Sequence, residues 1–390
     1  GPTGWPSTMV VDGAGRVIGA APGLDAFDLV IEAVASELSH PAGRRDRERP
    51  GRDEATTGSR QRSPLARGLA QADWTDPGGR DLAELRDDTT LWFPSAVAAT
   101  PDGLVAVADS GNDRLLIGGM DADQRTFRPD VEITDVVAPT ALAFGSDALI
   151  YAIEGGSGAI LQIDLGAGTV DLVADEELGI PTDLLVDLDG SLVVADAGHD
   201  QLVRIVGTGG SDVVIGPIAG GTGTGCHDGA AHRAGLAQPV GVARTGNGIV
   251  FCDAASSNVR ILTDDGSVHT VTGNAFFDWG LVDGPANQAR LQRPGALAVR
   301  ADGSIVIADT GNDRIRILAD RRIRTLGLTG LDQPSGVAVL PSGHLLVADT
   351  GNHRLVVADA EGRRAWPVAV YPAVMTSVWE DEQAASGREG

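Results

Sequence analysis

The stretch PSGVAVLPSGHLLVADTGNHRLVV, residues 334–357, decides the fold of this 390-residue chain. An alternating apolar run follows Pro334 and predicts a β-strand. A Ser-Gly pair then turns the chain, because glycine supplies the positive φ that tight hairpins need. A second strand ends at Asp349, the turn TGNH follows, and residues 354–357 predict a third strand. The stretch is thus one unit of short antiparallel strands.

This unit occurs six times. The other five are PSAVAATPDGLVAVADSGNDRLLI (94–117), PTALAFGSDALIYAIEGGSGAILQI (139–163), PTDLLVDLDGSLVVADAGHDQLVRI (181–205), PVGVARTGNGIVFCDAASSNVRIL (239–262) and PGALAVRADGSIVIADTGNDRIRIL (294–318). An acidic residue follows the proline by 15 positions in five units and by 14 in the fourth. Residues before the next proline supply a fourth strand. Six four-stranded units predict a mainly β fold, a six-bladed β-propeller spanning residues 81–375.

The unit P-x-G-[VL]-A-x6-G-x-[LIV]-x-V-A-D-[TS]-G-N-x-R-[LI] resembles the NHL repeat. The fifth and sixth units fit it closely and the first nearly so, whereas the second has EGGSGA in place of the DTGNxR turn. The resemblance covers roughly residues 90–360. It implies a propeller of the NHL type.

The turn after the second strand is the first candidate site. In each unit this turn returns the chain to the end of the blade where the proline lies. These turns and the links between blades therefore share one face of the propeller, which we call the turn face. Loops on a rigid scaffold commonly carry binding. Three units pair the acid with an arginine five residues later, and these pairs either join blades or read a ligand. The candidate pairs are Asp109 with Arg114, Asp309 with Arg314, and Asp349 with Arg354.

Two longer links between blades match each other. They are DGAAHRAGLAQP from Asp228 and DGPANQARLQRP from Asp283, and we call them the clasps. Their Ala and Leu spacing favours a short helical turn docked on the turn face. One interpretation is purely structural. The other is partner binding, because Phe276, Phe277 and Trp279 adjoin the second clasp and aromatic side chains commonly anchor partners.

An enzymatic site on this fold requires a different pattern. Lyases and lactonases built on six-bladed propellers hold a metal in the central channel, which needs convergent His or acidic residues. The seven histidines form no set of three at matching blade positions. We therefore predict no catalytic residues, no cofactor and no metal. A metal-dependent lyase or hydrolase, or calcium in the channel, stays open as the alternative.

The first 40 residues differ in character. They predict two short strands and a helix, with apolar residues at helical spacing between Leu24 and Leu38. Strand, strand and helix after a Trp-Pro pair resembles the C-terminal half of a thioredoxin-like domain, in which Pro6 corresponds to the cis-proline. The resemblance implies an α/β segment linked to thiol–disulfide exchange through an upstream half that carries CxxC. Residues 41–80 predict an Arg-rich flexible linker, and residues 376–390 a disordered tail.

Composition restricts the partners. The net charge is −24 and the sequence contains no Lys, so we expect neither nucleic acid nor membrane as a partner. Two cysteines, Cys226 and Cys252, lack CxxC spacing and predict unpaired thiols in a reducing, cytoplasmic compartment. We expect a monomeric, non-catalytic scaffold that binds a protein or a small ligand on the turn face. Ring closure has two candidates, residues 363–374 in the sixth blade or an outer strand near residues 82–93.

Overall fold

The computed structural model describes residues 7–11, 17–22, 90–134, 136–146, 148–175, 177–208, 213–273 and 278–376. The chain divides into two units, Gly1–Asp81 and Leu82–Gly390. In the first unit, β1 (Ser7–Val11) and β2 (Val17–Pro22) pair antiparallel, as the two predicted strands should. Pro6 and the helix expected over 24–38 lie outside the described residues, so the thioredoxin-like assignment stays a prediction.

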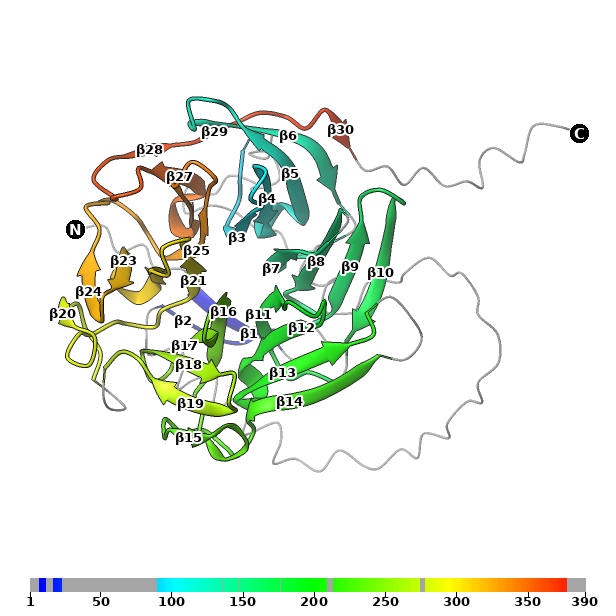
Figure 1. The fold of residues 1–390 in the computed structure, drawn as a ribbon. Coiled ribbons are helices and arrows are strands. Elements are labelled where there is room, and N and C mark those ends of the chain that lie inside the picture. The colour runs from blue at the N-terminus through cyan, green and yellow to red at the C-terminus, as the bar shows by residue number, and fades with distance from the viewer. Residues whose placement is uncertain are drawn as a thin grey trace, which may run out of the picture. The chain divides into compact units, whose positions relative to one another are not determined.

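The second unit is a ring of six sheets, in each of which four consecutive strands pair antiparallel from the inside outward (Figure 1). Blade 1 contains β3 (Pro94–Ala99), β4 (Leu104–Asp109), β5 (Arg114–Met120) and β6 (Thr126–Ile133). Blade 2 contains β7 (Pro139–Phe144), β8 (Leu149–Glu154), β9 (Ile160–Asp164) and β10 (Thr169–Ala174). Blade 3 contains β11 (Pro181–Val186), β12 (Leu192–Asp196), β13 (Gln201–Val206) and β14 (Val214–Gly220).

The remaining blades repeat the order. Blade 4 contains β16 (Pro239–Thr245), β17 (Gly248–Asp253), β18 (Asn258–Thr263) and β19 (Ser267–Thr270). Blade 5 contains β21 (Ala296–Val299), β22 (Ile305–Asp309), β23 (Arg314–Ala319) and β24 (Arg322–Thr325). Blade 6 contains β25 (Pro334–Val339), β26 (Leu345–Asp349), β27 (Arg354–Ala358) and β28 (Ala365–Pro367). The predicted six-bladed propeller is confirmed.

The spacing between proline and acid sets the register of the inner hairpins. Pro94 pairs with Asp109, and Pro334 pairs with Asp349. The turn after each acid therefore lies at the end of the blade where the inner strand begins, as predicted. In blades 1, 3, 5 and 6 this turn is a short 3-10 helix, as at Thr350–Asn352. The D-G turns lie at the opposite end.

The core consists of apolar layers between neighbouring blades. Strand side chains alternate between the two faces of each sheet, so each second strand contributes to two layers. Val107 of blade 1 packs with Leu346 of blade 6, whereas Ala108 packs with Ile150 of blade 2. The layer between the last blade and the first is therefore of the same kind as the others.

The C-terminal segment closes the ring in two steps. β28 completes blade 6, which confirms the first of the two predicted closures. The chain then runs along the outer edge of blade 1, where β29 (Ala369–Val370) and β30 (Met375–Thr376) pair parallel to β6 (Figure 1). Arg125 and Arg128 of blade 1 lie over the rings of Trp366 and Tyr371. Residues 90–93 of the alternative closure form no strand, and the rest of it lies outside the described residues.

Candidate binding face and central channel

The acid that ends the second strand is buried in five of the six blades and bonds within its own blade. Asp109 and Asp309 have no exposed surface. Their Oδ1 atoms accept backbone N–H bonds from Trp92 at 2.6 Å and Gln292 at 2.7 Å, two residues before each inner proline. The same bond joins Val137 to Glu154, Ala237 to Asp253, and Asp332 to Asp349. The repeated acid thus fixes the start of its own inner strand, and in the five blades where it is buried a partner cannot reach it without opening the blade.

Two of the three predicted charge pairs are present. Arg114 Nε lies 2.8 Å from Asp109 Oδ2, and Arg354 Nε lies 2.7 Å from Asp349 Oδ2. Arg114 is buried, whereas 40% of the Arg354 side chain is exposed. Hydrogen-bonded charges of this kind stabilise a turn more than neutral bonds do. In these two pairs, Arg354 has the surface that a partner could contact.

The third predicted pair, Asp309 with Arg314, is wrong. Asp309 instead binds Arg316, whose Nη1 lies 2.6 Å from Oδ2, while Arg314 Nη1 donates to the Asp313 carbonyl at 2.8 Å. Arg316 is fully buried, and its Nη2 lies 2.7 Å from Asp283 of the second clasp. Arg316 thus bonds both Asp309 and Asp283, and it has the role that the sequence predicted for Arg314.

The clasps are built into their blades by the same contacts. Asp228 binds the buried Arg260 at 3.0 Å and accepts both the backbone and hydroxyl donors of Thr270 at 2.8 Å. Asp283 makes the matching bonds to Arg316 and Thr325. After each aspartate, a two-residue strand, β15 (Gly229–Ala230) or β20 (Gly284–Pro285), pairs with the outermost strand of its blade. A short 3-10 helix, Ala231–Arg233, is present in the first clasp. These contacts support the structural interpretation of the clasps.

In blades 1, 3, 5 and 6 a second contact joins the turn to the next blade. The left-handed residue that ends the turn accepts a backbone N–H from the residue before the next proline. Asp113 accepts from Ala138, Asp200 from Gln238, and Asp313 from Gln333, each at 2.8 Å. Between blades 6 and 1, His353 Nδ1 accepts from Phe93 at 3.1 Å and its ring stacks on Trp92 at 4.3 Å. Burial lowers the pKa of His353, opposed by the charge of Asp332.

Large apolar side chains are exposed on the turn face beside these polar contacts. Trp279, Leu281 and Val282, which lie just before the second clasp, are 58%, 48% and 40% exposed. Phe93 and Ile180, each directly before an inner proline, are 41% and 62% exposed. Asn312 of the blade 5 turn donates to the Gly280 carbonyl at 2.8 Å, which holds this segment against the turn face. Phe276 and Phe277 lie outside the described residues, so their role stays a prediction.

A cavity of about 520 Å³ follows the axis of the ring and is lined by the inner strands of all six blades. Each inner strand is the last in its sheet, so its second edge has no strand partner and faces this channel. Unpaired backbone groups on such an edge are available to water or ligands. Among the described residues that line the cavity, two are ionisable, Asp183 and Arg244. Arg244 lies at the D-G end and binds Asp264 at 2.8 Å.

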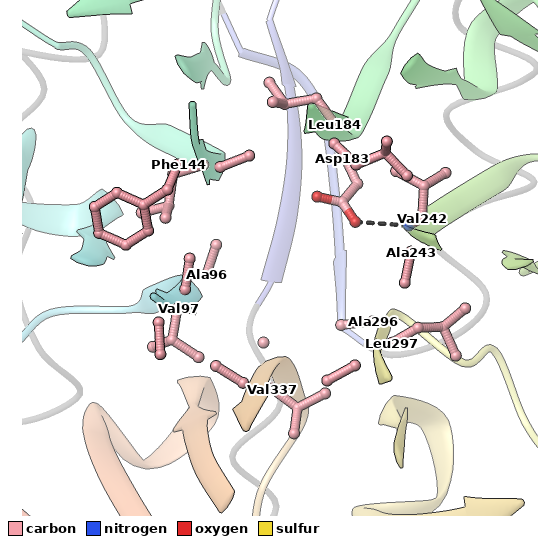
Figure 2. A pocket seen from close by; sticks show the side chains of 18 of the residues that line it. Ala96, Val97, Phe144, Asp183, Leu184, Val242, Ala243, Ala296, Leu297 and Val337 are labelled. Atoms are coloured by element: carbon pink, nitrogen blue, oxygen red, sulfur yellow. Dashed lines mark hydrogen bonds between the residues drawn. The ribbon is translucent and has the colours of Figure 1, made fainter. Parts of the chain in front are cut away.

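Asp183 is the carboxylate of the channel. Its Oδ2 accepts the backbone N–H of Val242 in the next blade at 2.8 Å, and its other oxygen points toward the open centre (Figure 2). Burial raises the pKa of Asp183 to about 6, opposed by the N–H donors of Val242 and Leu184. Among the described residues, no cation lies within salt-bridge distance of this carboxylate. The site therefore holds an acid near the axis without a positive partner.

Asp183 was not predicted from the sequence, although the repeat contains the signal. The residue two positions after each inner proline is small in the other five blades: Ala96, Ala141, Gly241, Ala296 and Gly336. A Cβ on Gly336 would lie 2.9 Å from the Cα of Ala96, because neighbouring inner strands approach closely there. An aspartate at this crowded position departs from the repeat.

Metal-ligating clusters and membrane spans are both absent from the described part of the chain. Within it, no three or more His, Cys, Asp or Glu side chains are grouped so that they could hold a metal ion. Nor does that part contain a helix with the length and apolar character needed to cross a membrane. Both cysteines are free, as predicted, and Cys252 is fully buried.

Fold and turns together define a six-bladed β-propeller. Residues 331–358, which include the first three strands of blade 6, match the family described as NHL repeat. No curated protein matches the chain in sequence. Among solved structures, it is similar to a protein of unknown function from Bacteroides thetaiotaomicron, with 16% identity and a TM-score of 0.51 over 68% of this chain and 69% of that one. This similarity supports the fold alone.

Two other similarities are weaker. An auxiliary nutrient binding protein from Bacteroides ovatus is 20% identical with a TM-score of 0.49, over 60% of this chain and 59% of that one. A streptogramin B lyase is 14% identical with a TM-score of 0.47, over 68% of this chain and 92% of that one.

Proposed function

We propose that this propeller is a non-catalytic binding module that docks a protein partner on its turn face. The exposed apolar group formed by Trp279, Leu281 and Val282 carries the proposal. Exposed apolar side chains that lie together mark interaction sites more often than single ones do. Trp279 is the strongest candidate anchor, because tryptophan is enriched among residues that dominate binding energy.

The shape of this surface favours a protein over a small molecule. Small-molecule sites are concave and enclose most of the ligand. Trp279 and Leu281 instead project from a link between blades, with about half of each side chain exposed. The segment is held by Asn312 and by backbone bonds between Gly280 and Leu291, so little conformational freedom is lost on binding.

Arg314 and Arg354 belong to the polar surroundings of this face. Both side chains are partly exposed, and both lie directly after the 3-10 turns of blades 5 and 6. Charged residues at the rim of an interface mainly affect association rate and specificity. We propose that these two arginines orient the partner rather than anchor it.

Site-specific photo-crosslinking tests the proposal even though the partner is unidentified. The crosslinking residue replaces Val282 on the turn face or, as the control, the exposed Leu188 on the opposite face. We expect a discrete product from position 282 in extracts of the source cells, and its loss when Trp279→Ala and Leu281→Ser are added. The same products from both positions, or a product from position 282 that survives these substitutions, would contradict the proposal.

A link to thiol chemistry has less support. The thioredoxin-like interpretation rests on the Trp-Pro pair and on the predicted order of strand, strand and helix in the sequence. Neither Cys226 nor Cys252 belongs to that segment, so the redox interpretation requires cysteines outside this sequence.

A further inference from the structure

The central channel contains a feature that docking on the turn face does not use. We propose that the channel binds a primary alkylammonium group, with Asp183 as its counter-ion. The proposal is independent of the partner suggested for the turn face. It rests on one carboxylate, the free edges around it and the apolar walls.

The carboxylate lies where the repeat otherwise permits almost no side chain. The equivalent positions are occupied by Gly or Ala in the other five blades. Substitution by Ala would therefore suit the fold of blade 3, yet the chain places a charge there. A partly buried charge without a neighbouring cation is unfavourable, so such residues commonly belong to functional sites.

The surroundings of Asp183 suit a cation that donates hydrogen bonds. The Val242 N–H donates to Oδ2, and the other carboxylate oxygen points toward the channel centre (Figure 2). An ammonium group has three N–H donors. The carboxylate accepts one. We expect backbone carbonyls along the inner-strand edges, which have no strand partner, to accept the others.

The rest of the lining fits an alkyl chain. Phe144, Leu184 and Val337 are among the side chains around the cavity, together with several alanines (Figure 2). The volume of about 520 Å³ is within the range of small-ligand sites. A divalent metal fits less well, because calcium takes six to eight oxygen ligands and one carboxylate supplies few of them.

Two sources share this chemistry: a free amine, and a lysine side chain of another protein. These 390 residues contain no Lys, so no side chain within them supplies the ammonium group. Calorimetric titration with n-butylamine represents the free amine. A lysine blocked at both its backbone amino and carboxyl groups represents the protein side chain, and 1-butanol is the uncharged control.

We expect saturable binding of at least one ammonium probe and none of 1-butanol at the same concentrations. Asp183→Asn should weaken that binding roughly ten- to hundredfold, because the charge-assisted bond is lost. Asp171→Asn, which removes an equal charge from the exposed edge strand of blade 2, should leave it unchanged. Tighter binding of the blocked lysine would assign the site to a protein ligand, and tighter binding of n-butylamine to a free amine.

Asp183→Ala, which reproduces the residue of blades 1, 2 and 5, is the second variant if Asp183→Asn does not fold. Circular dichroism establishes folding before each titration. Equal binding of the amines to wild type and a folded Asp183 variant would overturn the proposal. So would equal binding of 1-butanol, or no saturable binding of either amine.

Discussion

Asp183 of blade 3 accepts a hydrogen bond from the backbone N–H of Val242 in blade 4, 2.8 Å away, across the boundary between the two blades. The bond satisfies a donor on the free edge of an inner strand. It also keeps a carboxylate in the channel where its charge is poorly solvated. Stability and ligand binding therefore make opposite demands on this residue.

The first prediction concerns the pH dependence of stability at Asp183. Burial raises its pKa from 3.8 to about 6, so the folded state takes up this proton before the unfolded state does. Its charge then lowers stability as pH rises from about 4 to 6, and the full effect is present above 6. At pH 8, Asp183→Asn should raise the free energy of unfolding by up to about 3 kcal/mol.

Denaturant unfolding at pH 8 and pH 4 measures this effect, with Asp171→Asn as the control. The difference between wild type and Asp183→Asn should shrink toward zero at pH 4. A variant less stable than wild type at pH 8 would show that the carboxylate stabilises the channel.

The second prediction concerns His353, which joins blade 6 to blade 1. Its Nδ1 accepts the Phe93 N–H and so must be unprotonated. Burial lowers the pKa of this imidazole below 6.5, so the unfolded state takes up a proton first as pH falls. The contribution of His353 is complete above pH 6.5 and is lost as pH falls through the lowered pKa.

His353→Asn provides the matched comparison, because an amide oxygen accepts a hydrogen bond without titrating. The equivalent residues Asp113, Asp200 and Asp313 already use an oxygen here. Thermal unfolding between pH 7.5 and 5 should show a larger fall in Tm for wild type than for His353→Asn. Parallel curves would mean that His353 does not contribute to acid sensitivity.

The third prediction separates the two arginines of β23. Arg316→Met leaves Asp309 buried without its cation and should cost about 3–5 kcal/mol of stability. Arg314→Met removes a partly exposed side chain bonded to a carbonyl and should cost about 0–1 kcal/mol. Urea unfolding of both variants measures the difference. Equal losses of stability in the two variants would indicate that Arg314 also has the structural role that the sequence predicted for it.

A fourth prediction concerns Arg314 as a contact for the partner. Arg314→Glu should reduce the yield of the crosslinked product at position 282 several-fold. Its Tm should be similar to that of Arg314→Met. Arg354→Glu is a poorer probe, since it places two carboxylates together at the buried Asp349. Loss of folding and crosslinking in parallel at Arg314 would identify a structural residue.

The sequence predicts the propeller because the repeated spacing from proline to acid corresponds to one structural unit, the inner hairpin of a blade. The distance from Pro94 to Asp109 is the length of one hairpin, and the two residues are paired in the sheet. Which side chains form an ion pair is harder to predict from the spacing along the sequence. Arg314 is the strand partner of Asp309, yet Arg316 binds it, because the clasp aspartate supplies a second partner for Arg316.

The candidate site was predicted less completely than the fold. Trp279 could be proposed from the sequence because it adjoins the second clasp and aromatic side chains commonly anchor partners. Asp183 resembles any polar residue in an alternating strand, and only comparison of the six positions after proline distinguishes it. The two short strands along β6 have too few residues to produce a pattern, and their pairing depends on closure of the ring.

The central claim is that the apolar group on the turn face binds a protein partner. Calorimetric titration of the partner identified by crosslinking, with wild type, Trp279→Ala and Leu188→Ser, tests it most directly. Trp279→Ala should raise Kd at least about thirtyfold, as expected for loss of a dominant anchor, and Leu188→Ser should leave Kd unchanged. An unchanged Kd for Trp279→Ala, or an equal loss at Leu188, would contradict the claim.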